Sequence, residues 1–539
     1  MAPRHDRATA APRTAGPGAT PRAVTGAGIG LGFTSFGDIV ADPAHGHVFV
    51  SGGPGTKRVV VTDLAGNVQQ KLRSMPGADG MVLSRDGSTL YVALADGDGI
   101  RQIDTSTLAG SKVSTGASTC PRDLAVTAGL VWFSYSCDSA NGALGALDPG
   151  AGTVHLGLAT GFPGTPMLAA SPGLDGVLIT GVPGGSPATI TRDDVTGGAT
   201  PTATATTSTQ PGSNLRDLAM TPDGTQVVVA SESLGYHQVF KASDLSAAGT
   251  YQTSSSPNAV AIAADGRVAA GVDGVSSKDV WLFEPGVTSP TKKWDFGSSD
   301  PLQPRGLAFA GGVIYAVTGD HTPGSPTYLH VLSTKPDAPL TVTTDRTAYR
   351  YGARAKVTIH LSSPGSAKGV AIYATPAGGK RVLVKSGDLS GGTFSARHRV
   401  TRKTLFTGVY EGGATYGPTS KTQTVKVHAK VVTKLRGSYA KRHGYALYHV
   451  DKDPKLLATV SPNHAGECLH FVAQRPKTGD GWKTFGRTGC VPLSSTSQAG
   501  AVLTGTHVVG EKVRLRARWA GDPVSLKQTS VWSYVRFTR

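Results

Sequence analysis

The stretch "SRDGSTLYVALADGDGIRQIDTSTL", residues 84–108, contains a turn dipeptide, an apolar strand and a second strand that ends in Ile-Asp-Thr. Its turn, Asp86-Gly87, favours a tight hairpin, because glycine adopts a positive φ without steric strain. A run of β-branched and aromatic residues after such a turn is typical of a β-strand. The stretch therefore predicts an antiparallel sheet, and the same pattern recurs along the chain.

A short apolar strand, an X-Gly turn and a second apolar strand occur seven times between residues 37 and 319. A third strand follows each copy, and a fourth strand follows every copy except the last. One register is marked, at spacings of 42 to 50 residues, by Ile39, Met81, Leu124, Leu168, Leu218, Val260 and Leu307. This is the period of a four-stranded propeller blade. We expect "RAVTGAG", residues 22–28, to supply the missing strand and close the ring, which removes exposed sheet edges.

The repeat at 83–108 resembles a repeat of the YVTN or lactonase-like propellers, and "MTPDGTQVVVASES", from residue 220, is a weaker copy. The resemblance covers residues 22–335 and implies a seven-bladed β-propeller. Some relatives are ring-opening lactonases or lyases with a metal in the central channel. A propeller-type hydrolase or lyase with a channel metal is therefore the alternative function, although the chain has no recognisable site pattern of either enzyme. The fold alone does not fix the function.

After residue 336 apolar and polar residues alternate, with turns every 8 to 12 residues, which is typical of a β-sandwich. The segment 406–427 is echoed by 515–537, and this alignment places Tyr410 on Trp519 and Gly412 on Gly521. The two copies resemble bacterial Ig-like repeat domains.

The predicted fold class is therefore all-β, a seven-bladed β-propeller followed by two tandem Ig-like β-sandwiches. The expected parts are a flexible N-terminal tail (1–21), the propeller (22–335), a first Ig-like domain (336–428) and a second Ig-like domain with a disulfide (429–539).

The four cysteines fall in two close pairs, Cys120 with Cys137 and Cys468 with Cys490, each within one predicted hairpin. Counting outward from the Ala128-Gly129 turn places the first pair directly opposite each other, provided that the strand contains no bulge. Disulfides persist in oxidising compartments, so we expect an extracellular or cell-wall associated protein. The sequence as given begins without a signal peptide, because its first residues lack a continuous apolar segment. No apolar run approaches the ~18 residues of a transmembrane helix.

Charge differs sharply between the two parts of the chain. Residues 1–337 contain 21 Lys and Arg against 27 Asp and Glu, a net charge of −6, whereas residues 338–539 contain 32 against 9, a net charge of +23. Such a one-sided field attracts polyanions. We expect residues 336–539 to bind an anionic cell-wall polymer or polysaccharide; the alternative is a solvated basic face that only aids solubility. The disulfides and the absence of a nucleic-acid motif argue against intracellular nucleic acid as a partner, and we expect a monomer.

Arginine and aspartate recur at the start of the predicted inner strands. The candidate ligand-binding residues at the channel mouth are Arg122, Asp123, Arg216, Asp217, Arg305 and Asp38. Guanidinium and carboxylate groups in alternation could grip a carboxylated or phosphorylated ligand. The alternative is that they pair with one another and hold neighbouring blades together.

No other cluster predicts chemistry. Asp96 and Asp98 resemble the start of a calcium loop but lack its distal Glu, so a polar loop is expected. Trp482 and Trp532 are expected to pack within the second sandwich. We therefore predict no catalytic residues, no metal ligands and no cofactor, and a protein that is more a binding protein than an enzyme.

Overall fold

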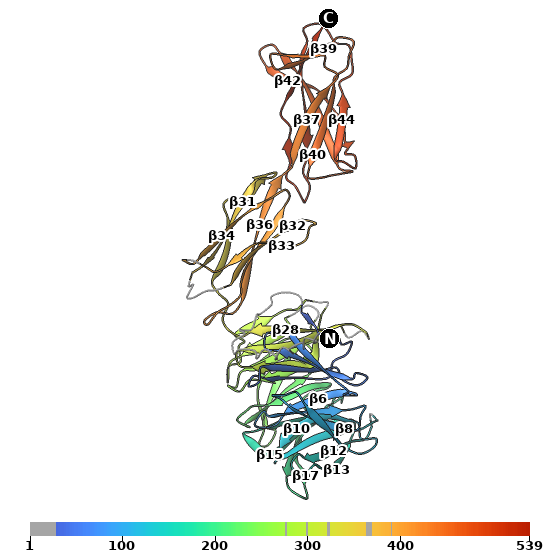
Figure 1. The fold of residues 1–539 in the computed structure, drawn as a ribbon, viewed down its shortest axis with the longest axis vertical. Coiled ribbons are helices and arrows are strands. Elements are labelled where there is room, and N and C mark those ends of the chain that lie inside the picture. Colours follow the sequence, from blue (N-terminus) through green and yellow to red (C-terminus); the bar gives the residue numbers. More distant parts are fainter. Residues whose placement is uncertain are drawn as a thin grey trace, which may run out of the picture. The chain divides into compact units, whose positions relative to one another are not determined.

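A computed structural model describes residues 28–138, 140–274, 278–297, 300–320, 324–362, 369–389 and 391–539, in which every regular element is a β-strand (Figure 1). The chain divides into two compact units, Met1–Lys335 and Pro336–Arg539. The tail predicted for residues 1–21 lies outside the described residues. No helix in the described ranges is long and apolar enough to cross a membrane.

The described part of the first unit forms seven four-stranded antiparallel sheets. The first strands are β2 (Ile39–Asp42), β6 (Ala78–Leu83), β10 (Pro121–Thr127), β14 (Met167–Ser171), β18 (Leu215–Met220), β22 (Pro257–Ile262) and β26 (Leu302–Ala310). The second strands are β3 (His47–Ser51), β7 (Thr89–Leu94), β11 (Leu130–Tyr135), β15 (Leu174–Gly181), β19 (Gln226–Ser231), β23 (Val268–Val272) and β27 (Val313–Gly319).

In each sheet the third strand pairs with the second, and the fourth strand forms the outer edge. The third strands are β4 (Arg58–Asp63), β8 (Gly99–Asp104), β12 (Gly142–Asp148), β16 (Ile190–Thr196), β20 (Tyr236–Lys241), β24 (Val280–Phe283) and β28 (Thr327–Ser333). The fourth strands are β5 (Val68–Arg73), β9 (Gly110–Ser114), β13 (Thr153–Phe162), β17 (Thr202–Thr209), β21 (Ala247–Gln252), β25 (Lys292–Trp294) and, in the last sheet, β1 (Ile29–Gly30).

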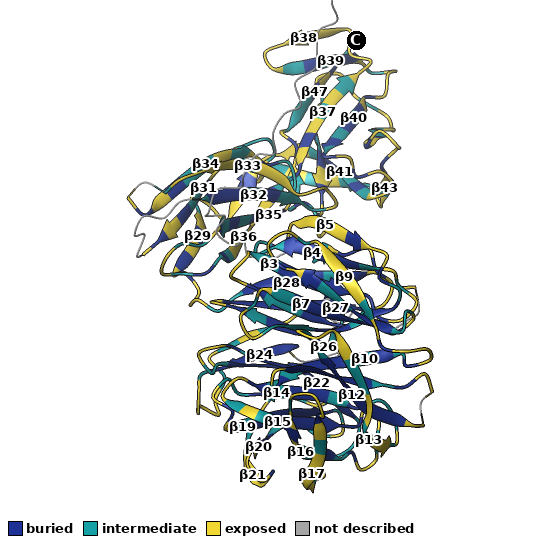
Figure 2. Ribbon diagram, turned by 60° about the horizontal axis from the view of Figure 1, so that its bottom comes forward, coloured by how far each residue is buried: buried dark blue, intermediate teal, exposed yellow. Residues whose placement is uncertain are grey.

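The first strands contact one another in sequence order from β2 to β26, and β26 contacts β2. The sheets therefore stand around a central axis with their first strands innermost, which is the arrangement of a β-propeller. The second strands are almost wholly buried, whereas β5, β9 and β17 are largely exposed (Figure 2). The apolar cores lie between adjacent sheets and position the starts of the inner strands around one channel mouth.

The predicted hairpin turns are confirmed in six of the seven sheets; in the fourth the predicted turn, Asp175-Gly176, lies within β15, and the chain turns at Pro172-Gly173. Gly87 has a φ of 73° and Gly224 a φ of 73°, in the left-handed region that glycine adopts without strain. At the third repeat Ala128 also has a positive φ, 53°, before Gly129 at 73°. Two consecutive residues with positive φ are what a two-residue type I′ hairpin requires.

The N-terminal segment does pair with the last sheet, but at a different place from the one predicted. The pairing strand is β1, in which Ile29 lies opposite Leu329 and Gly30 opposite Tyr328. Of the predicted strand 22–28, only Gly28 is among the described residues, and it is not part of a strand. The other residues of the predicted strand, 22–27, lie outside the described residues.

The Thr-rich segment of the fourth repeat forms the outer strand β17, which pairs along its length with β16. Threonine is β-branched and suits an exposed edge strand. Alternation of Thr with Ala here is an edge-strand pattern.

Both predicted disulfides are present. Cys120–Cys137 and Cys468–Cys490 each have a Cα–Cα distance of 5.0 Å. The register predicted for the first pair was wrong, because β10 contains a bulge: Leu124 lies opposite Phe133, but Pro121 lies opposite Tyr135. Cys120 and Cys137 therefore meet just beyond the end of the ladder, where Cys120 has a φ of 47°.

We expect the double variant C120S/C137S to lower the free energy of unfolding of the first unit by about 3 kcal/mol, because the bond closes a loop in the unfolded chain. Thermal unfolding of the variant and of the parent protein in non-reducing buffer measures this difference. Equal transition temperatures would show that the bond does not stabilise the fold.

The second unit contains two pairs of sheets. One sheet of the first pair contains β29 (Leu340–Thr344), β31 (Arg354–Leu361) and β34 (Thr393–Arg399). The other sheet of this pair contains β30 (Ala348–Arg350), β36 (Thr419–His428), β35 (Thr404–Tyr410), β32 (Val370–Pro376) and β33 (Val382–Gly387). One sheet of the second pair contains β37 (Lys430–Arg436), β40 (Lys455–Ser461) and β44 (Gln498–Val502). The other, larger sheet contains β38 (Ala440–Arg442), β39 (Tyr445–His449), β47 (Ser533–Thr538), β45 (Lys512–Trp519), β41 (Cys468–Lys477) and β42 (Gly481–Arg487). In this larger sheet β43 (Val491–Pro492) also pairs with β41, and β46 (Gln528–Thr529) pairs with β45.

Each pair encloses its own apolar core. In the first pair, Ile359 of β31 and Phe406 of β35 belong to one buried cluster. In the second pair, Leu456 of β40 and Leu515 of β45 belong to another. Alternate residues of these strands face inward, so the intervening Lys and Arg residues lie on the outer faces.

The predicted internal alignment of the two copies agrees with their structures. Tyr410 and Trp519 are both buried at the ends of β35 and β45. The glycines that follow them, Gly412 and Gly521, have φ values of 97° and 92°. In both copies the chain turns at this glycine, and the segment that follows pairs antiparallel with the strand that precedes the glycine.

Candidate functional site

Bulges near the start of the inner strands shape the channel mouth. In β10 three residue steps, from Pro121 to Leu124, lie opposite two steps in the neighbouring strand. In β26 five steps, from Leu302 to Leu307, lie opposite two. The bulge in β26 is therefore longer by two residues, and it contains Arg305.

Arg305 lies at the centre of the candidate site. Its Nη2 donates a hydrogen bond to Asp123 Oδ1 at 2.7 Å and lies 3.6 Å from Asp38 Oδ2. These two carboxylates come from different sheets, and Asp38 and Asp123 are more than 80 residues apart in the chain. Arg305 has a φ of 61°, an uncommon conformation for a residue with a Cβ. Such strain persists only where the surroundings determine the conformation.

The three predicted aspartates share one hydrogen-bonding pattern. In each, Oδ1 accepts a hydrogen bond from the next backbone N–H, and Oδ2 accepts one from a backbone N–H of the following sheet. The bonds between sheets join Asp38 to Met81 (2.7 Å), Asp123 to Leu168 (2.9 Å) and Asp217 to Val260 (2.7 Å). Each aspartate therefore bonds one sheet to the next through a backbone N–H, and Asp38 and Asp123 also pair with Arg305.

Burial shifts the protonation equilibria of this cluster. It raises the pKa of Asp38 to about 6 and that of Asp217 to about 7, although Arg305 acts in the opposite direction. Burial also raises the pKa of Asp79. Burial by itself lowers the pKa of Arg305, but attraction to the surrounding aspartates outweighs it, so this pKa lies above its ordinary value. The arginine therefore remains charged, while Asp38 and Asp217 take up protons at a higher pH than ordinary aspartates do.

The other two predicted arginines lie nearer the solvent. Arg122 Nη1 is 3.3 Å from Asp79 Oδ2, and its side chain is 38% exposed. Arg216 Nε donates a hydrogen bond to Glu232 Oε2 at 2.7 Å, and its side chain is 43% exposed. The structure thus brings Arg305 together with Asp38 and Asp123, whereas Arg122 and Arg216 each have a separate partner.

The sequence interpretation missed those two partners, Asp79 and Glu232. Asp79 stands two residues before Met81, the same position relative to the repeat register that Arg305 has before Leu307. Comparing that position across the repeats would have identified it. Glu232 follows directly after β19 and has no counterpart in the repeat pattern.

Farther along the inner strands the character of the channel changes. A cavity of about 410 Å³ is lined by residues of β6, β10, β14 and β18, chiefly Ala, Val, Leu and Met. Ala125, Ala169 and Ala219 are among them. The channel therefore has charged groups at the strand starts and apolar walls beyond them.

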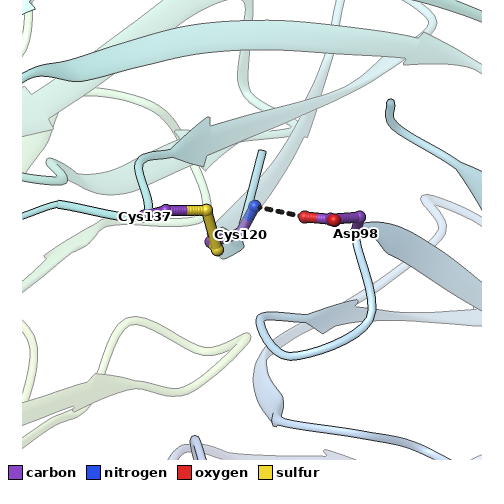
Figure 3. A group of neighbouring side chains, drawn as sticks. All are labelled: Asp98, Cys120 and Cys137. Carbon is purple, nitrogen blue, oxygen red and sulfur yellow. Dashed lines mark hydrogen bonds between the residues drawn. A yellow bond between two sulfur atoms is a disulfide. The ribbon is translucent and has the colours of Figure 1, made fainter. Parts of the chain in front are cut away.

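Asp98 does not form a metal site. In the described ranges, the one group of at least three His, Cys, Asp or Glu ligand atoms close enough for a metal consists of Asp98, Cys120 and Cys137. Both sulfur atoms are joined in the disulfide, and Asp98 accepts a hydrogen bond from the backbone N–H of Cys120 (Figure 3). Asp98 also accepts hydrogen bonds from the backbone N–H groups of Ser118 and Thr119. The carboxylate therefore fixes the loop before β10, in agreement with the polar loop predicted.

A second candidate surface lies on the outer face of the large sheet in 429–539. Arg514, Arg516 and Arg518 alternate along β45, and Arg487 of β42 lies on the same face, since both Arg516 and Arg487 are opposite Val472. Two tryptophans also lie there, outside the core in which we expected them. We call this surface the arginine face and define it as Trp482, Arg487, Arg514, Arg516, Arg518 and Trp532.

The guanidinium groups of this face pack on its aromatic rings. The Arg514 guanidinium carbon lies 4.7 Å from the Trp482 ring centroid and 4.3 Å from that of Trp532, and Arg516 lies 4.2 Å from Trp532. Burial and repulsion from Arg514, Arg518 and Arg487 lower the pKa of Arg516. None of the four arginines has an ion pair with a carboxylate among the described residues.

Comparisons with known proteins found similar folds among solved structures. No family model matches the chain, and no curated protein matches it. Among solved structures, hydrazine synthase of Kuenenia stuttgartiensis is 16% identical, with a TM-score of 0.42, over 58% of this chain and 99% of that one. The β-propeller domain of Cps50 (Swd1) from Myceliophteria thermophila is 15% identical, with a TM-score of 0.41, over 55% and 96%. Hsv2 of Kluyveromyces lactis is 10% identical, with a TM-score of 0.36, over 55% and 97%.

Proposed function

We propose that this chain is a secreted or cell-surface, non-enzymatic binding protein with two separate tasks. The first unit is a seven-bladed β-propeller of the YVTN or lactonase-like kind that serves as a recognition platform. The second unit consists of two tandem Ig-like domains, residues 336–428 and 429–539, which attach the protein to anionic material of the cell envelope.

The distribution of charge is the observation that carries this proposal. Residues 338–539 have a net charge of +23, whereas residues 1–337 have a net charge of −6. The positive side chains lie on the outer faces of strands such as β31 and β45, where they remain accessible. On the arginine face they stand without carboxylate partners in the described ranges. Binding of a polyanion to a surface of this kind is favourable, because the polyanion replaces bound counterions.

Recognition by the propeller is supported by the channel mouth. Arg122 and Arg216 are each about two-fifths exposed, and Arg305 is 22% exposed. An anionic ligand, carboxylated or phosphorylated, is the class that exposed guanidinium groups bind best. The two disulfides are compatible with an oxidising compartment outside the cell.

We expect the full-length protein to sediment with purified bacterial cell walls at low ionic strength and to be released near 1 M salt, where the Debye length falls to ~3 Å. Co-sedimentation across a salt series measures this. Retention that does not change with salt, or no retention at low salt, would contradict electrostatic attachment.

A further inference from the structure

The arginine face contains more positive charge than its own surroundings neutralise. Arg514, Arg516 and Arg518 are neighbours along one strand, and Arg487 lies across from Arg516. Their mutual repulsion contributes to the lowered pKa of Arg516. Arg516 Nε is also buried without a hydrogen-bond partner in the described structure. A bound anion would relieve both the repulsion and this unsatisfied donor.

Spacing along β45 is regular. Side chains on one face of an antiparallel strand recur every second residue, so Arg514, Arg516 and Arg518 stand about 7 Å apart in turn. A linear polymer with anionic groups at the same interval can meet all three without bending. The spacing of the arginines along β45 therefore favours a ligand whose anionic groups have the same spacing.

The aromatic rings hold the guanidinium groups in place. Arg514 packs on both Trp482 and Trp532, and its Nε donates a hydrogen bond to Gln474 Oε1 at 2.8 Å. A guanidinium fixed in this way loses little further conformational entropy when it binds an oxyanion. The rings themselves are engaged by cations, so they are poor platforms for stacking sugar rings or nucleic-acid bases.

We propose that the arginine face binds an extended polyol phosphate, in which three-carbon polyol units are joined by phosphodiester groups. Six covalent bonds separate successive phosphorus atoms in such a polymer, and an extended chain of six bonds spans about 7 Å. This inference rests on the proposed attachment to envelope material and names the polymer class. Single-stranded DNA has the same number of bonds between phosphates, but its tight binding relies on free aromatic faces.

The test uses the full chain and immobilised poly(glycerol phosphate) as the probe. We expect the variant R514Q/R516Q to bind about tenfold more weakly than the parent protein, because charge-assisted hydrogen bonds are lost. A second variant, R487Q/R518Q, changes exposed arginines of the same face without removing the contacts to tryptophan, and it should also bind more weakly. Circular dichroism and thermal unfolding show whether each variant is folded.

The matched control is R397Q/R399Q, which removes the same charge from β34 in the first domain. Arg397 and Arg399 are exposed and lie opposite Lys356 and Arg354, so they form another basic pair of strands without tryptophan. This control should retain affinity within about twofold, as expected for a general change of surface charge.

The outcomes separate this inference from the proposed function. Equal weakening by R514Q/R516Q and R397Q/R399Q would overturn the arginine face as the site while leaving electrostatic attachment intact. Stronger binding to a carboxylated polysaccharide or to single-stranded DNA than to poly(glycerol phosphate) would overturn the polymer class. Failure of the parent protein to bind every one of these polyanions would overturn the proposed function itself.

Discussion

The variant R305M should lower the free energy of unfolding of the first unit by about 4 kcal/mol, because it leaves buried carboxylates without their counter-charge. Arg305 is the group that contacts both Asp38 and Asp123, and it attracts Asp79 and Asp217 as well. Methionine has a similar length and fills much of the same space, so the loss reports mainly on charge. In a domain of this size the melting temperature should fall by about 10 °C.

The matched control for this experiment is R216M. Arg216 is 43% exposed and pairs with Glu232, which is itself 33% exposed. Partly exposed pairs contribute at most about 1 kcal/mol. Differential scanning calorimetry of the parent protein and both variants at neutral pH makes the comparison. If R305M unfolds at the same temperature as R216M, the central cluster does not stabilise the propeller.

The contribution of Asp38 and Asp217 to the stability of the first unit should fall as the pH rises from about 5 to about 8. Burial raises the pKa of Asp38 to about 6 and that of Asp217 to about 7 in the folded protein. In the unfolded chain both titrate near the ordinary value of 3.8. Between these values the folded state binds more protons than the unfolded state, so raising the pH favours unfolding. The stability contributed by these groups is fully present only below the unfolded pKa of 3.8 and is lost as the pH rises through the folded pKa values.

The expected change in their contribution is about 4 kcal/mol across this window, since one pKa unit corresponds to about 1.4 kcal/mol and the folded pKa values of about 6 and about 7 lie about one and two units above pH 5. Melting temperatures measured from pH 4.5 to pH 8.5 test the sign. The variant D217N removes one of the two titrating groups and should flatten the curve. Burial lowers the pKa of His237 and of His330 to about 4, and these histidines affect the parent protein and D217N alike. Melting temperatures of D217N that depend on pH just as those of the parent protein do would contradict the cluster as described.

Much of the fold follows from local chemistry in the sequence. Asp86-Gly87 and its six counterparts require positive φ, and apolar strands on either side have no other way to bury their faces than in hairpins. The pairing of Cys120 with Cys137 was predicted for the same reason, because a hairpin brings its ends together. Strand identity and turn position are local properties and could be predicted.

The structural features that depend on β-bulges could not be predicted from the sequence. The one-residue bulge between Pro121 and Leu124 shifted the cysteines out of register, and the longer bulge in β26 carries Arg305 to a position from which it reaches Asp38 and Asp123. Nothing in "QPRG", residues 303–306, distinguishes an arginine at the centre from one at the rim. Arg122 and Arg216 stand at the same repeat position and take different partners.

The arginine face was only partly foreseen. Alternation of basic and apolar residues in "RLRARW", from residue 514, predicted exposed arginines on a strand. That Trp482 would lie against them depends on pairing of β45 with the β41–β42 hairpin, which lies more than 20 residues earlier in the chain. Trp532 directly precedes β47, which pairs with the other edge of β45. Tertiary pairing of this kind determines which side of a sheet a tryptophan occupies.

The division of tasks between the two units is the central claim, and it is tested most directly by separate polypeptides of residues 28–335 and 336–539. Each corresponds to the described part of one compact unit of the chain. Both are mixed with purified bacterial cell walls and sedimented across a salt series. The account predicts that only residues 336–539 sediment with the walls and that salt releases them. Sedimentation of residues 28–335 alone, or of neither polypeptide at low salt, would contradict it.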